Sequence, residues 1–143
     1  MKKILKVIKV IFFLLVLLIS SCVYYFYQKS ATYDPIAIPF IKEVMPKLST
    51  WDLATHRLYS TNESNEILND RDLARSLKWL SKLGALESIE KPKLTGVMNG
   101  NFITYYFIAH YKNGDAGITI QLEDDNDKFL INQFHVESKA LIE

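Results

Sequence analysis

The chain has 143 residues with 17 basic and 16 acidic side chains, which leaves a formal net charge of +1. This near balance, with no basic stripe along the sequence, argues against nucleic acid as a partner. A single cysteine excludes an intramolecular disulfide, and without a Cys/His cluster a structural zinc site is excluded as well. We therefore expect no metal and no cofactor, and the part after the N-terminal segment is long enough for one domain.

The N-terminal segment, residues 1–27, is basic and then apolar. Its lysines precede an uninterrupted apolar run from Val10 to Ile19. They are Lys2, Lys3, Lys6 and Lys9. This order is typical of an export signal or a membrane anchor, with the basic side retained in the cytoplasm. We expect the segment to hold the remaining chain on the extracytoplasmic side of a bacterial membrane.

Two interpretations of this segment remain open. The tetrad Ile19-Ser20-Ser21-Cys22 resembles the lipobox of bacterial lipoproteins, which implies lipidation of Cys22. The competing interpretation is an intact transmembrane helix, because Ile8 to Tyr27 supplies the roughly 20 residues that a span requires. Tyrosines at 24, 25 and 27 would then form an aromatic belt at the outer interface. A freely secreted product is the third possibility, and all three export the same domain.

A short linker and an interrupted helix are predicted next. Pro35 and Pro39 disfavour helix in residues 28–39, so this segment is expected to be a linker. A helical pattern begins at Phe40 and is expected to be interrupted near Pro46. The face that follows is apolar at helical spacing and consists of Leu48, Trp51, Thr55 and Leu58. Trp51 is expected to anchor this helix against a sheet, and residues 59–67 are expected to form a loop.

The second helix has clear signals at both ends. Asn69 or Asp70 can cap its start, and Gly84 suits the position after its end. Its apolar stripe is formed by leucines at 73, 77 and 80, while basic residues lie mostly outside that stripe.

The C-terminal half changes to the periodicity of strands. The predicted strands are Leu86–Ile89, Leu94–Met98, Phe102–Tyr111, Ala116–Glu123 and Lys128–Glu137. Asn99-Gly100 is a strong hairpin signal, and the long apolar segment after it is expected to be the central strand. The run Asp124-Asp125-Asn126-Asp127 lacks the spacing of a calcium loop and is expected to be a solvated turn.

Helices followed by an antiparallel meander predict an α+β domain over residues 40–143, with two main helices packed on a curved sheet of about four strands. Over Ile38–Ser138 the layout resembles the cystatin-like, nuclear-transport-factor-2-like superfamily. The resemblance rests on element order, on Leu83-Gly84-Ala85-Leu86 and on the closing strand Phe134-His135-Val136-Glu137-Ser138. It implies a cone-shaped sheet, and enzymes of the superfamily carry acids, tyrosines or histidines inside that cone.

Tyr106, His110 and His135 are the pocket candidates that this resemblance suggests. Strand periodicity places Tyr106 and His110 on one face, but no spacing brings a carboxylate beside either histidine. With no catalytic motif in the sequence, we expect a non-enzymatic, membrane-anchored module that binds other proteins of the cell envelope. Bitopic assembly components of type IV secretion machines, which belong to the superfamily, have a similar layout. The alternative is a small-ligand binder or a cone-site enzyme.

Overall fold

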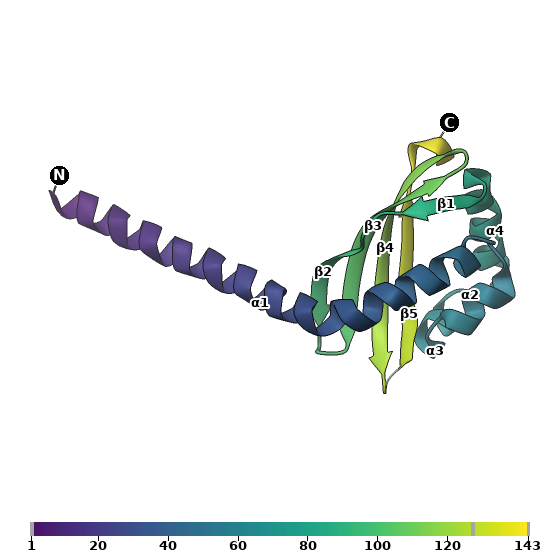
Figure 1. The fold of residues 1–143 in the computed structure, drawn as a ribbon, viewed down its shortest axis with the longest axis horizontal. Helices are drawn as coiled ribbons and strands as arrows, with labels where there is room; N and C mark the ends of the chain where they lie inside the picture. Colours follow the sequence, from purple (N-terminus) through teal and green to yellow (C-terminus); the bar gives the residue numbers. More distant parts are fainter. Residues whose placement is uncertain (1, 127, 143) are drawn as a thin grey trace. The chain divides into compact units, whose positions relative to one another are not determined.

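The computed structural model describes residues 2–126 and 128–142. The chain divides into two compact units, Met1–Asp34 and Pro35–Glu143, and each is described by itself. Helix α1, Lys2–Leu48, contributes to both units (Figure 1). Asp127, the last residue of the predicted acidic turn, lies outside the described residues.

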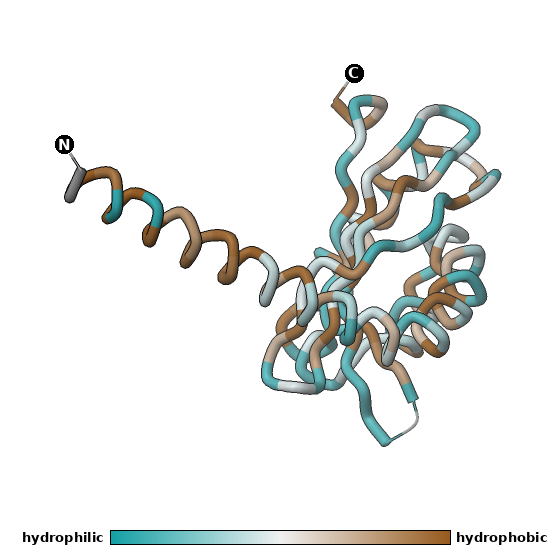
Figure 2. The backbone as a smooth tube through the Cα atoms, turned by 60° about the vertical axis from the view of Figure 1, so that its left-hand side comes forward, coloured by the Kyte–Doolittle hydropathy of each residue, from teal (hydrophilic) through white to brown (hydrophobic). Residues whose placement is uncertain are grey.

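The N-terminal unit is a single helical segment whose residues are mostly hydrophobic (Figure 2). By length and composition the helix that begins in this unit is able to cross a membrane, which is compatible with a membrane anchor or a signal. Ser20 and Ser21 satisfy their hydroxyl donors within the helix, because Ser20 Oγ donates to the Val16 carbonyl at 2.8 Å and Ser21 Oγ to the Leu17 carbonyl at 2.9 Å. Cys22 is exposed on the same helix.

The predicted linker is wrong, because α1 is helical through residues 28–39 and through Pro46 to Leu48. Pro35, Pro39 and Pro46 are all exposed and recur on one face of the helix. The carbonyls that lose their helical partners are those four residues before each proline, and on this face they remain accessible to water. The opposite face is apolar and buried, and it comprises Ala37, Ile41, Val44, Met45 and Leu48. Burial of this face outweighs the cost of the prolines.

The predicted α+β class is confirmed by one antiparallel sheet with helices, although the strand count differs. The described chain has five strands, each overlapping one of the five predicted segments, whereas the sheet as a whole was expected to have about four. They are β1 (Leu86–Ile89), β2 (Lys93–Met98), β3 (Phe102–Tyr111), β4 (Gly114–Asp125) and β5 (Lys128–Glu137). The order is β1-β3-β4-β5, and β2 pairs with the other half of β3. Strands β1 and β2 thus follow one another along the same edge of β3, so five strands occupy four positions in the sheet.

The core lies between the sheet and the C-terminal part of α1. Every second residue of β3 is buried, from Ile103 to Tyr111, and so is every second residue of β4 from Ala116 to Leu122. Phe40 of α1 contacts Phe129 of β5 with ring centroids 5.6 Å apart. At the other end of the helix, the Ser49 and Tyr111 hydroxyls are 3.1 Å apart.

Besides α1, the described chain has five helical elements, where two main helices were predicted. They are α2 (Leu53–Tyr59), α3 (Asn62–Ile67), α4 (Asp70–Leu80) and the 3₁₀ turn η1 (Ser81–Leu83), and a second 3₁₀ turn, η2 (Lys139–Leu141), closes the chain. Residues 59–67, predicted to be a loop, therefore contain α3. The predicted start of α4 is confirmed, since Asn69 Oδ1 accepts a hydrogen bond from the Asp72 backbone N–H at 2.9 Å.

The predicted helical face through Leu48, Trp51 and Leu58 is wrong, because these residues belong to separate elements and Leu58 is 72% exposed. Trp51 lies just after the end of α1 and has a φ of 59°, a left-handed conformation at the point where the chain turns back. Its ring lies 5.8 Å from that of Tyr111 on β3 and stacks on His56 at 6.3 Å. The prediction that Trp51 packs against the sheet is thereby confirmed, with its indole N–H left without a hydrogen-bond partner.

Candidate functional site

The inner face of the sheet, which corresponds to the interior of the predicted cone, is covered by α1. Ile41, Val44 and Met45 are at most 1% exposed, and so are Tyr105 and Ile120 on the strands they face. Where α1 covers this face, a ligand site would have to displace the packed helix. The outer face and the edges of the sheet are therefore the places where a binding site is accessible.

Tyr106 and His135 lie on the outer face and do not meet. Tyr106 pairs with Thr119, and Thr119 pairs with His135, so the three side chains form a row across β3, β4 and β5. With neighbouring strands about 4.8 Å apart, Tyr106 and His135 are separated by about 10 Å. The tyrosine ring instead lies over Gly117, where a Cβ would come within 3.0 Å of its hydroxyl.

His110 has acidic partners that sequence reasoning missed. Its Nδ1 is 2.7 Å from an Asp115 oxygen, and its Nε2 is 3.6 Å from Glu90. The hydrogen bond to Asp115 is the main cause that raises the pKa of His110 above its usual value. A usable signal was present, because a two-residue turn at Lys112-Asn113 places position 110 directly opposite position 115. The three predicted candidates therefore remain three separate surface positions.

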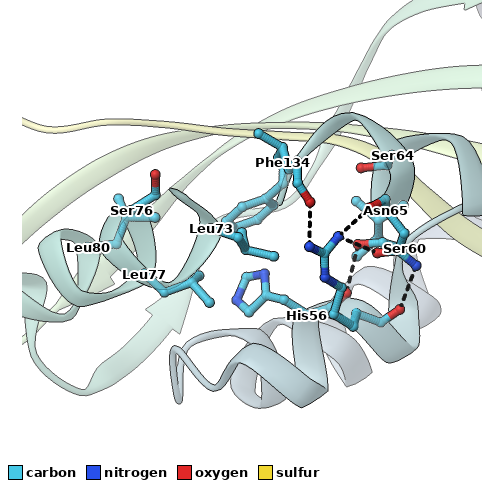
Figure 3. A pocket seen from close by; sticks show the side chains of 12 residues that line it. His56, Ser60, Ser64, Asn65, Leu73, Ser76, Leu77, Leu80 and Phe134 are labelled. Atoms are coloured by element: carbon cyan, nitrogen blue, oxygen red, sulfur yellow. Dashed lines mark hydrogen bonds between the residues drawn. The ribbon is translucent and has the colours of Figure 1, made fainter. Parts of the chain in front are cut away.

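A groove runs instead between β5 and the helices α3 and α4. Its most enclosed part is a pocket of about 180 Å³ (Figure 3). Leucines 73, 77 and 80 of α4 form one wall, and Ile131 and Phe134 of β5 form the other. Two shallower pockets continue along β5, one beside α3 and one beside Trp79 of α4.

Arg57 holds the helical side of the groove together. Its guanidinium donates to Asp70 Oδ1 at 2.9 and 3.1 Å, to the Asn65 carbonyl at 2.9 Å and to the Leu68 carbonyl. A planar guanidinium is suited to several fixed acceptors at once. Arg57 thus joins α2 to α3 and to the start of α4, and its donors are already used within the protein.

His56 is a structural residue at the base of the same groove. It is 6% exposed, its Nε2 lies 2.9 Å from the Leu48 carbonyl, and its ring meets Phe134 edge-on at 5.8 Å. Burial lowers the pKa of His56, which favours the neutral ring. A neutral Nε2–H then donates to Leu48 and links the end of α1 to α2. No carboxylate is bonded to this ring in the described part of the chain.

The two edges of the sheet differ in how they are protected. The β1/β2 edge is divided by Pro92, is irregular in register at two places, and carries charges at Glu87, Lys91 and Lys93. Short strands, proline, bulges and charges are the features that block pairing with another chain. The β5 edge has ten residues, and between Lys128 and Glu137 it carries no Asp, Glu, Lys or Arg.

Only the beginning of the β5 edge is covered. Thr61 donates its backbone N–H to the Ile131 carbonyl at 3.0 Å, and Ser60 forms an isolated parallel bridge to the same residue. Beyond Ile131, residues 132–137 of β5 lie at the edge of the sheet and pair with no further strand among the described residues. This open edge beside the groove is the candidate functional site.

No protein-family model, curated protein or solved structure matches the chain. The candidate site therefore rests on the geometry of this protein alone.

Proposed function

We propose that this protein is a membrane-anchored, extracytoplasmic binding module of a bacterial cell envelope, without catalytic activity, whose folded unit holds another envelope protein. The observation that carries the proposal is the open β5 edge beside the groove. An exposed edge supplies a row of backbone donors and acceptors, and a neighbouring groove receives alternate side chains of an added strand. The partner in this proposal contributes an extended segment.

The cystatin-like arrangement is part of the same proposal. Helices on one face of an antiparallel sheet and the element order support it. The helix-covered inner face favours binding at the edge over the alternative of a cone-site enzyme or ligand binder. The enclosed part of the groove, at about 180 Å³, is also smaller than the roughly 300–1,000 Å³ of ordinary small-molecule sites.

The anchor would keep the folded unit close to the membrane. Seven residues, 28–34, separate Tyr27 from Pro35. A chain of this length spans about 10 Å as a helix and at most about 25 Å when extended. Pro35, where the folded unit begins, would therefore lie within that distance of the bilayer surface.

Matched charge insertions at the two edges test the proposal. Val136 on β5 and Val97 on β2 are both half-buried valines on edge strands, so Val136→Lys and Val97→Lys introduce the same change. Full-length protein is purified from gently solubilised native membranes, and bound proteins are quantified by mass spectrometry. We expect Val136→Lys to lose a near-stoichiometric partner and Val97→Lys to retain it. Equal retention by both, or no partner for the wild type, would overturn the proposal.

The mode of anchoring needs a separate experiment. A reporter enzyme that is active only outside the cytoplasm is fused after residue 34, and its activity is expected in whole cells. Labelling with a fatty-acid analogue then separates the two interpretations, because a lipoprotein loses its label in Cys22→Ser while a transmembrane helix carries none. An inactive reporter would contradict the extracytoplasmic location.

A further inference from the structure

A basic stripe runs along the outer face of α4 and the following turn. It consists of Arg71, Arg75, Lys78 and Lys82, which are all exposed. Their spacing of four, three and four residues places them on one side of a helix. Leucines 73, 77 and 80 occupy the opposite side, toward the groove. Helix formation thus gathers charges that are not conspicuous along the sequence.

These four cations have no ion-pair partner among the described residues, whose ion pairs involve other side chains. The surrounding unit has the opposite charge. Five of the 17 basic residues and one of the 16 acidic residues precede Pro35, so the unit from Pro35 onward carries 12 positive and 15 negative charges. A row of uncompensated cations on an otherwise acidic domain is suited to an anionic partner.

The stripe borders the groove through Trp79. This side chain is 44% exposed and lines the same pocket as His135, Val136 and Glu137 of β5. Arg75 precedes it by four residues and Lys82 follows it by three, so both are its neighbours on the helix surface. A strand added to β5 would therefore lie beside an apolar ring that Arg75 and Lys82 flank on the helix surface.

We infer that the segment bound at the β5 edge is an acidic, extended stretch of a partner protein, with its carboxylates directed at the α4 stripe; this rests on the proposed function. Backbone pairing with β5 fixes the strand, Trp79 contacts an apolar side chain, and Arg75, Lys78 and Lys82 select for carboxylates. A second copy of this chain is a poorer occupant. Two-fold pairing of β5 with itself would add a second basic stripe to the interface without adding the acidic segment that the first one requires.

Peptide binding to the full-length protein in an uncharged detergent tests the inference. The probes are fluorescently labelled eight-residue peptides of alternating Glu-Val and of alternating Lys-Val, measured by anisotropy at low and high salt. We expect the acidic peptide to bind at least about tenfold more tightly than the basic one, with an affinity that falls as salt rises. Equal affinities would overturn the inference.

Three variants assign the binding to the stripe and the edge. Arg75→Glu/Lys78→Glu is expected to lower the affinity for the acidic peptide about tenfold or more. Val136→Lys is expected to abolish binding of this peptide. Lys93→Glu/Lys112→Glu is the matched control, because it reverses the charge of two exposed lysines outside the groove. It is expected to change the affinity for the acidic peptide little. Unchanged binding in the first variant overturns the inference. Circular dichroism verifies that each variant is folded.

Other occupants give distinct results. Inorganic polyphosphate tests for a general anion-binding surface. If it binds Val136→Lys but not Arg75→Glu/Lys78→Glu, the stripe is such a surface, and the inference of an added acidic strand is overturned. A wild-type dimer in sedimentation that Val136→Lys dissociates would identify a second copy as the occupant and equally overturn it. If native partner capture is lost in Val136→Lys but kept in Arg75→Glu/Lys78→Glu, the proposed function stands and the acidic specificity fails. If both variants keep the partner, both fail.

Discussion

Two isoleucines on α1 provide a direct measure of how far this helix belongs to the folded domain. Ile41 is fully buried, whereas Ile36, five residues earlier in the same helix, is 58% exposed. Truncation of a buried isoleucine to alanine costs about 2–5 kcal/mol through lost transfer energy and the cavity left behind. At an exposed position the cost is within about 0.5 kcal/mol. Ile41→Ala is therefore expected to remove a large part of the roughly 5–15 kcal/mol available to a domain.

Urea unfolding of residues 28–143, followed by circular dichroism, measures this difference. The fragment retains all of the buried hydrophobic residues, which begin at Ala37. With a urea m-value of about 1–3 kcal/mol/M, the midpoint should fall by about 1–3 M for Ile41→Ala and stay nearly unchanged for Ile36→Ala. Equal shifts in both variants would refute the packing of α1 on the sheet, because composition and helix propensity are identical in the two substitutions.

Three smaller effects follow from local geometry. Because burial lowers the pKa of His56 below 6.5, the unfolded chain binds a proton that the folded chain does not, so the free energy of unfolding should fall as the pH drops through 6.5. The pH profile of His56→Gln, subtracted from that of the wild type, isolates this term; a flat difference contradicts it. Asn69→Ala should cost about 0.5–2 kcal/mol in thermal unfolding, and Asn69→Ser should restore most of it. Gly114→Ala should cost about 1–3 kcal/mol, since its φ is 149° and the new Cβ would lie 2.9 Å from the Cβ of Ala140. Gly96→Ala meets its nearest atom at 3.7 Å and should be tolerated, so equal costs at the two glycines would contradict the steric argument.

The strands of this protein could be predicted from local sequence because local signals determine them. Phe102–Tyr111 and Lys128–Glu137 have the predicted bounds, and the first of these is the central strand. Asn99 and Gly100 both have positive φ, at 51° and 78°, as the hairpin signal requires. Alternation and turn residues act over a few positions, and no distant contact overrides them here.

The path of α1 was predicted wrongly because each proline was considered by itself. Pro35, Pro39 and Pro46 each disfavour a helix locally, and local reasoning counts them equally. Their common position on the exposed face matters only once the opposite face is buried by strands that follow much later in the chain. A check of the apolar periodicity from Ala37 to Leu48 against the proline positions would have indicated a continuous helix.

The candidate site was predicted least well, because it depends on which edge remains open. Tyr106, His110 and His135 were selected by chemistry and share only the outer face. The strand that contains His135 was predicted correctly, but its place at the end of the sheet depends on topology. In the same way, β1 and β2 occupy the opposite edge only because of how the whole sheet assembles.

The position of α1 in the sequence also constrains when the domain is able to fold. This helix leaves the ribosome before the strands that cover it, while β5, whose Ile131 contributes to the buried core, is made after the other four strands. Until residue 137 is available, the apolar side of residues 37–48 has no complete sheet to cover it. The apolar side of this helix would therefore stay exposed on the nascent chain until β5 has emerged. A chain truncated before β5 would be expected to remain a target for chaperones and proteases.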